Sequence, residues 1–185
     1  MLDRLLRYDL HIHTCLSPCG DIDMTPQNIV NMAVLAGLDV IAVTDHNSCG
    51  TCAAVMEAAA GKPLTVLPGM ELCTSEDIHA VCLFPTLSQA LAFEQQVIPA
   101  RMPVANRPEV FGEQLLMNSQ DQVIGREETL LVAATSISID QVPSLAAAYG
   151  GTAFPAHIDR PSYSITSALG DVPPLGFTAV EISVD

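Results

Sequence analysis

Two histidines, His11 and His13, lie two residues apart at the end of an apolar run. Side chains alternate between the two faces of a strand, so both imidazoles should point to one side while Leu10 and Ile12 face the opposite way, into a core. A neutral imidazole is a common metal ligand. A pair of ordinary core or surface histidines is the competing interpretation. The metal site is favoured because all five histidines adjoin predicted strands and Glu71 follows a further apolar run.

Strand-like apolar runs alternate with helical patterns along the chain. The sequence predicts strands over residues 7–12, 40–44, 65–71, 78–84, 152–156 and 178–184, and helices over 25–35, 51–60, 87–97 and 139–149. Thr25 followed by Pro26 is typical of a helix start, and Gly37 and Gly61 are typical of helix ends. This alternation predicts an α/β fold with a parallel sheet or barrel.

The region at about 99–131 breaks the alternation. Pro99, Pro103 and Pro108 interrupt it, and residues 111–124 can form two short strands around a polar turn. We interpret the region as an irregular insertion with a hairpin. It lies within a single domain spanning residues 1–185, which is a length that suits one domain.

The candidate functional residues fall where a parallel α/β fold binds its ligands. Such folds bind outside the carboxyl ends of their strands, where the following loops meet. A parallel α/β fold would therefore bring residues that lie far apart in the sequence together at one end of the sheet. They are His11 and His13 after the first predicted strand, Asp45 and His46 after the second, Glu71 at the end of the third, and His157 after the strand at 152–156.

These residues also belong to a recognisable series of motifs. The series is Asp-Leu-His-Ile-His-Thr at 9–14, Ile-Ala-Val-Thr-Asp-His-Asn at 41–47, Pro-Gly-Met-Glu at 68–71, Ile-His at 78–79 and Ala-His at 156–157. Over almost the whole chain it resembles the PHP (polymerase and histidinol phosphatase) family of metal-dependent phosphoesterases. The resemblance implies a distorted, TIM-like (β/α)7 barrel. It also implies up to three divalent ions, variously zinc, manganese or iron, that serve to hydrolyse phosphate esters.

The resemblance further assigns ligands to two of these ions. One of these ligands is His79, for which the alternative interpretation is a histidine within a strand that makes a single hydrogen bond. The implied ligands are His11 and His13 for the first ion, Glu71 as a bridge between the first and the second, and His79 and His157 for the second.

A third ion is implied at His46, with a companion in the loop after the first strand. Cys19 and Asp21 both fit the offset of that companion. A thiolate suits zinc, whereas a carboxylate also accepts manganese or iron. The offset slightly favours Cys19, and Asp21 stays beside it as the alternative.

Two further residues are candidates for supporting catalysis. Asp45 adjoins His46 and is interpreted as an outer partner that orients the cluster, with a helix N-cap as the alternative. Arg160 lies three positions after His157. Its planar fork can hold two phosphate oxygens, and a surface ion pair is the competing interpretation.

The sequence departs from the family pattern at its end. The family continues beyond the strand at 178–184 to an Asp-x-His motif that supplies the last ligands of the first and third ions, whereas this sequence ends at Asp185. The expected barrel is therefore C-terminally incomplete. We expect weakened occupancy of the third ion site and an open sheet edge that could promote homo-oligomerisation.

Charge and composition restrict the partners and the location. The net charge is −14, from 21 acidic and 7 basic residues, so long nucleic acid is an unlikely partner, because backbone binding depends on Lys and Arg. A small phosphorylated substrate remains compatible. No apolar run nears the roughly 20 residues of a membrane span, and the N-terminus shows no secretory signal. We therefore expect a cytoplasmic protein whose six cysteines are reduced.

The hypothesis that follows is a phosphoesterase that hydrolyses a small phosphorylated substrate with metal-activated water. Two alternatives remain open. One is a non-catalytic metal-binding or regulatory domain, and the other is a nuclease that acts on short oligonucleotides.

Overall fold

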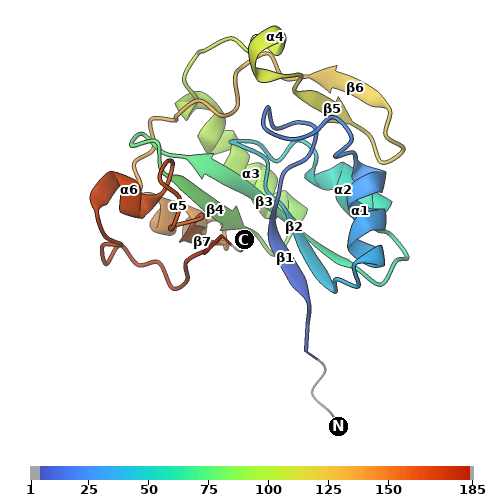
Figure 1. The fold of residues 1–185 in the computed structure, drawn as a ribbon, viewed down its shortest axis with the longest axis horizontal. Coiled ribbons are helices and arrows are strands. Elements are labelled where there is room, and N and C mark those ends of the chain that lie inside the picture. Colours follow the sequence, from blue (N-terminus) through green and yellow to red (C-terminus); the bar gives the residue numbers. More distant parts are fainter. Residues whose placement is uncertain (1–4, 184–185) are drawn as a thin grey trace.

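A computed structural model describes residues 5–183, which form an open, mixed sheet of five strands (Figure 1). The strands lie in the order β1-β2-β3-β4-β7. Their bounds are β1 (Tyr8–Ile12), β2 (Val40–Val43), β3 (Thr65–Cys73), β4 (His79–Leu83) and β7 (Thr152–Pro155). All five strands were predicted from the sequence to within two residues at each end.

Four helices cover one face of this sheet and build the main core. They are α1 (Pro26–Leu35), α2 (Cys52–Ala58), α3 (Leu87–Val97) and α5 (Val142–Ala148). Buried residues such as Val30 of α1 and Phe93 of α3 join Ile41 and Met70 of the strands in one cluster. The opposite face carries a much smaller apolar cluster, centred on β2, β4 and the end of β7. Within residues 5–183, every helix is too short or too polar to span a membrane.

The sequence suggested a parallel sheet, but the observed sheet is mixed. Strands β1, β2 and β3 are parallel, but β4 pairs with both β3 and β7 in antiparallel fashion. Residues 74–78 alone connect β3 to β4, and a parallel crossover needs a dozen or more residues. The first residue of β4 therefore lies at the same edge of the sheet as the last residues of β1, β2 and β3.

Strand β1 carries an irregularity next to the two histidines. Its register with β2 shifts between Asp9 and Ile12. Leu10 consequently packs on the small apolar cluster, while Ile12 packs against the main core. The prediction that both residues face one core is wrong, because the shift breaks the simple alternation of a regular strand.

The sixth predicted strand does not form within the described residues. Residues 178–183 are irregular, and Val184 lies outside the described part of the chain. Their backbone nevertheless runs beside the end of β7, where Glu181 N donates to Pro155 O (3.0 Å) and Glu181 O accepts from Ile158 N (2.9 Å). The described chain is thus an α/β fold with an open sheet, and residues 5–183 do not complete a (β/α)7 barrel.

The region expected to be irregular contains the expected hairpin. It consists of η1 (Ile98–Ala100), α4 (Pro108–Phe111) and the antiparallel pair β5 (Leu115–Met117) and β6 (Val123–Arg126). Outside this region, a further short helix, α6 (Ile165–Leu169), follows β7. Asp121 in the hairpin turn accepts hydrogen bonds from Gln27 N (2.9 Å) and Thr25 Oγ1 (2.7 Å) at the start of α1. Arg101 Nε donates to Asn47 O (3.0 Å). These contacts hold the region against the loops that carry the histidines.

Candidate metal centre

Every histidine of the chain converges on one buried carboxylate. Glu71, near the end of β3, is 1% exposed, and each of the five imidazoles places a nitrogen 3.0–3.1 Å from one of its oxygens. The two oxygens face different groups. Oε1 faces His11 Nε2, His79 Nδ1 and His157 Nε2, whereas Oε2 faces His13 Nε2 and His46 Nδ1.

The direction of the strands explains how the histidines meet. His11 and His13 come from the end of β1, and His46 follows β2, as expected for parallel strands. His79 is the first residue of β4 and reaches this edge because β4 runs antiparallel. His157 follows β7 with a φ of +29°, a conformation that few residues other than glycine adopt.

Hydrogen bonds outside the cluster orient the two histidines of β1. Glu181 accepts from His11 Nδ1 (2.8 Å to Oε2), and since a carboxylate can only accept, Nδ1 carries the proton of this bond and Nε2 is the nitrogen that faces the cluster. The hydroxyl of Ser17 donates to Asp45 Oδ1 (2.7 Å), so the oxygen of Ser17 accepts from His13 Nδ1 (3.0 Å). Both imidazoles therefore turn Nε2 towards the centre and hold Nδ1 in a hydrogen bond outside the cluster, the arrangement found in metal-binding histidines.

Asp45 does not touch the histidines directly. It is fully buried and accepts from Thr14 N (2.7 Å), Thr14 Oγ1 (2.8 Å) and Ser17 Oγ (2.7 Å). Ser17 also accepts from His46 N (3.1 Å). Asp45 therefore ties the loop after β1 to the end of β2 and reaches the cluster through Ser17. The N-cap of α2 is Thr51, not Asp45.

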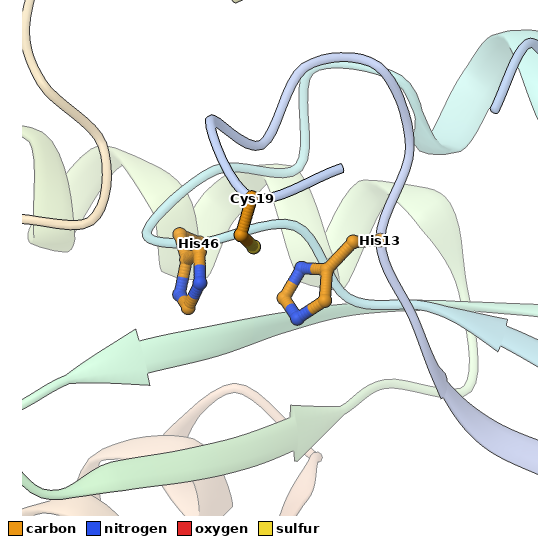
Figure 2. A group of neighbouring side chains, drawn as sticks. All are labelled: His13, Cys19 and His46. Atoms are coloured by element: carbon orange, nitrogen blue, oxygen red, sulfur yellow. The ribbon is translucent and has the colours of Figure 1, made fainter. Parts of the chain in front are cut away.

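The loop after β1 brings a thiol to the cluster. Cys19 Sγ, His13 and His46 form a group whose candidate ligand atoms lie within 4.8 Å of one another, and Figure 2 shows the three side chains pointing towards one another. The loop turns tightly at Gly20, where a Cβ atom would lie 2.2 Å from Thr14 O. Asp21 is exposed, its Oδ1 accepts from Asp23 N (2.9 Å), and it belongs to none of the candidate metal-binding groups in residues 5–183.

Burial and the central carboxylate set the charges of the cluster. Burial lowers the pKa of His46 to about 3. Burial also acts to lower the pKa of His11, but the hydrogen bond to Glu181 and the nearby carboxylate of Glu71 outweigh it and raise the pKa to about 10. Burial opposes ionisation of Glu71, yet its close contacts with the surrounding histidines hold its pKa well below the usual value. Burial, reinforced by Glu71, raises the pKa of the Cys19 thiol to about 11.

The polar atoms of the cluster fit bound metal ions. Burying a polar atom without a partner is costly, and native proteins do so rarely. Imidazole, carboxylate and thiolate donors suit zinc, and imidazole and carboxylate also suit iron and manganese. Among the described side chains, six buried polar atoms lack a hydrogen-bond partner, and five of them lie here: His11 Nε2, His46 Nδ1, Glu71 Oε2, His79 Nε2 and His157 Nδ1.

The cluster lines a pocket of about 450 Å³ that also contains groups suited to a substrate. Arg160 lines it, as the sequence had suggested, and its Nε donates to Ser183 Oγ (3.1 Å). Sequence reasoning missed Glu181, Ser162 and Tyr163, which line the same pocket. An acidic residue within the apolar run at 179–184 was the signal that could have identified Glu181.

Comparison with known protein families agrees with this geometry. The family model described as the PHP domain matches residues 9–150 of the chain. This chain belongs to the PHP domain family. The α/β architecture with its open, curled sheet fits the PHP and TIM-like fold that the motifs implied.

The PHP domain described here also resembles two curated proteins, both named 5'-3' exoribonuclease Rnm. It is 36% identical to the protein of Salmonella typhimurium over 81 residues, which are 41% of this chain and 27% of that protein. It is 34% identical to the protein of Escherichia coli over 92 residues, which are 47% of this chain and 30% of that protein. The matches thus span less than a third of each relative.

Solved structures share the fold of this PHP domain. An endonuclease, PfuEndoQ from Pyrococcus furiosus, aligns with a TM-score of 0.66 and 19% identity over 96% of this chain and 42% of its own. A candidate metal-dependent phosphoesterase from Bifidobacterium adolescentis aligns with a TM-score of 0.58 and 20% identity over 85% of this chain and 69% of its own. At identities of 19% and 20%, these alignments show a shared fold and do not by themselves show a shared activity.

Proposed function

We propose that this PHP domain is a metal-dependent hydrolase that acts on phosphate esters. The observation that carries the proposal is the convergence of all five histidines on the buried Glu71, with five polar atoms of the cluster lacking a hydrogen-bond partner. If the cluster held no ion, these atoms would remain without a partner, and that would lower the stability of the folded chain.

The geometry supports an assignment of ligands to up to three ions. Glu71 suits a bridging role, because its two oxygens face different sets of imidazoles. Cys19 suits the third ion better than Asp21 does, since its sulfur lies beside His13 and His46. The proposed ligands are His11 and His13 for the first ion, Glu71 as the bridge, His79 and His157 for the second, and His46 with Cys19 for the third.

The bound ions would activate water and neutralise charge on the phosphoryl group. The chain itself supplies orientation and binding. Glu181 and Ser17 hold the imidazoles of His11 and His13 in the tautomers that leave Nε2 free. Arg160 lines the same pocket and offers a planar cation to phosphate oxygens.

A second candidate function is the removal of nucleotides from the ends of short RNA. The names of the two curated relatives favour it, although the aligned segment spans less than a third of those proteins. The net charge of −14 opposes binding along a long nucleic acid, because few cations are available to displace counterions. A short end that enters a pocket of about 450 Å³ is compatible with both observations.

Elemental analysis paired with a panel of phosphate esters tests the proposal. The panel contains p-nitrophenyl phosphate, ribose 5-phosphate, nucleoside monophosphates and short RNA, each assayed with and without a chelator. We expect bound transition metal and chelator-sensitive turnover. Glu71→Gln should lose both, while Glu113→Gln, which removes a surface partner of Arg126, should keep both. Turnover that survives exhaustive chelation would contradict the proposal, and bound metal with no turnover on any ester would indicate a non-catalytic domain.

A further inference from the structure

One aromatic side chain stands beside the histidines in the metal pocket. Tyr163 is the sole Phe, Tyr or Trp among the described residues that line it, in a chain with 4% aromatic residues. Its ring stacks on the imidazole of His79, with centroids 4.8 Å apart and an angle of 17° between the planes. His79 covers one face, and Tyr163 is still 48% exposed. Part of this side chain therefore remains accessible in the pocket.

The backbone fixes the position of this ring. His79 N donates to Tyr163 O (2.9 Å), which ties the loop after β7 to the start of β4. Tyr163 itself has a φ of +58°, which a bulky residue rarely adopts. The next residue, Ser164, caps α6 by accepting from Ser167 N (3.1 Å). The ring is thus presented by an ordered turn, so little conformational entropy is lost when a flat group stacks on it.

The same turn carries groups that suit an anion. Arg160 and Ser162 line the same pocket as Tyr163 and the histidine cluster. A guanidinium recognises phosphate oxygens, and a phenol ring recognises the flat face of an aromatic system. A nucleotide contains both a phosphate group and a flat aromatic base. A plain sugar phosphate has no flat aromatic group to stack on Tyr163.

We propose that Tyr163 is a stacking platform for a nucleobase, so that the phosphate ester this domain hydrolyses belongs to a nucleotide. The inference rests on the proposed function and specifies its substrate class. Every base has a π-face, so stacking selects nucleotides without selecting one base. The acidic chain restricts the substrate to a mononucleotide or to the end of a short strand.

The sharpest test is binding, because it does not depend on turnover. The chain has three tyrosines, at positions 8, 149 and 163. Their ring signals can be resolved by NMR in zinc-loaded protein with carbon-13-labelled tyrosine, and assigned with Tyr8→Phe and Tyr149→Phe. The probes are the phosphonate analogue of adenosine 5'-monophosphate and the matching ribose phosphonate. We expect the adenosine probe alone to shift the Tyr163 signal. Equal shifts with both probes, or no shift with either, would overturn the proposal.

Kinetics provide a second test that separates this inference from the proposed function. The readout is the ratio of kcat/KM for adenosine 5'-monophosphate to that for ribose 5-phosphate. We expect Tyr163→Leu to lower this ratio about tenfold or more, given typical losses for a stacked base, and Tyr163→Phe to restore it. An unchanged ratio in Tyr163→Leu would refute the platform while leaving the hydrolase intact. Absence of turnover on every ester refutes the proposed function, and the NMR result then still decides the platform.

Discussion

Glu181 accepts a hydrogen bond from His11 Nδ1 at 2.8 Å, although 170 residues separate the two in the sequence. The same carboxylate accepts from His157 N at 2.9 Å. One irregular segment next to β7 thereby positions an imidazole from the opposite edge of the sheet. Carboxylates that hold a metal-binding histidine in this way set its tautomer and raise its basicity.

Replacement of Glu181 should therefore weaken metal binding. In Glu181→Gln, the negative charge and one of the two oxygens that accept from His11 Nδ1 are lost, so the bond that orients His11 weakens. We expect zinc affinity, measured by competition with a chromophoric chelator, to fall about 10- to 100-fold. Glu113→Gln serves as the matched control. An affinity equal to that of the unchanged chain would show that Glu181 does not position His11.

Removal of the Ser17 hydroxyl should destabilise the loop after β1 and loosen His13. Ser17 donates to Asp45 Oδ1 and accepts from His46 N and His13 Nδ1, so Ser17→Ala leaves several buried groups without a partner. We expect the free energy of unfolding to fall by about 1–3 kcal/mol in denaturant titrations, together with a lower zinc affinity. Ser144→Ala, at an exposed site on α5, should change neither quantity. Equal stability of the two variants would contradict the prediction.

Cys19 and Asp21 should differ in their effect on metal content. Cys19 lies beside His13 and His46, while Asp21 is exposed and bonded within its own turn. We expect Cys19→Ala to bind less zinc per chain than the unchanged protein, through loss of the partly occupied third site, because thiolates are strong zinc ligands. Asp21→Ala should bind the full amount. Elemental analysis of both variants checks this, and the reverse result would assign the third ion to Asp21.

Metal removal should lower thermal stability through the same cluster. A ligand that binds the folded state alone stabilises it, by about 2.7 kcal/mol when its free concentration is one hundred times the Kd. The unpartnered nitrogens of His46, His79 and His157 are the groups that gain partners. We expect added zinc to raise the melting temperature of the unchanged chain and to leave that of Glu71→Gln unaltered. The prediction fails if zinc stabilises both proteins equally, in a calorimetric comparison at fixed pH.

Much of the site was predictable because regular strands obey simple geometry. The carboxyl ends of β1, β2 and β3 lie at one edge, so His13, His46 and Glu71 meet there as the sequence implied. His79 was assigned to the site by its place in the motif series alone, without a geometric reason. Its position there depends on the antiparallel course of β4, which the short link at 74–78 already requires.

The sequence by itself determined where the five strands of the main sheet form and, through its series of motifs, which imidazoles gather around Glu71, because hydrophobic periodicity is a local property of the chain. Only the tertiary structure decided that Cys19 rather than Asp21 faces His13, and that Glu181 and Tyr163 flank the cluster. Those placements depend on a tight turn at Gly20 and on irregular backbone after β7. Such segments have no repeating pattern, and their course is set by long-range hydrogen bonds that exist only once the sheet has formed.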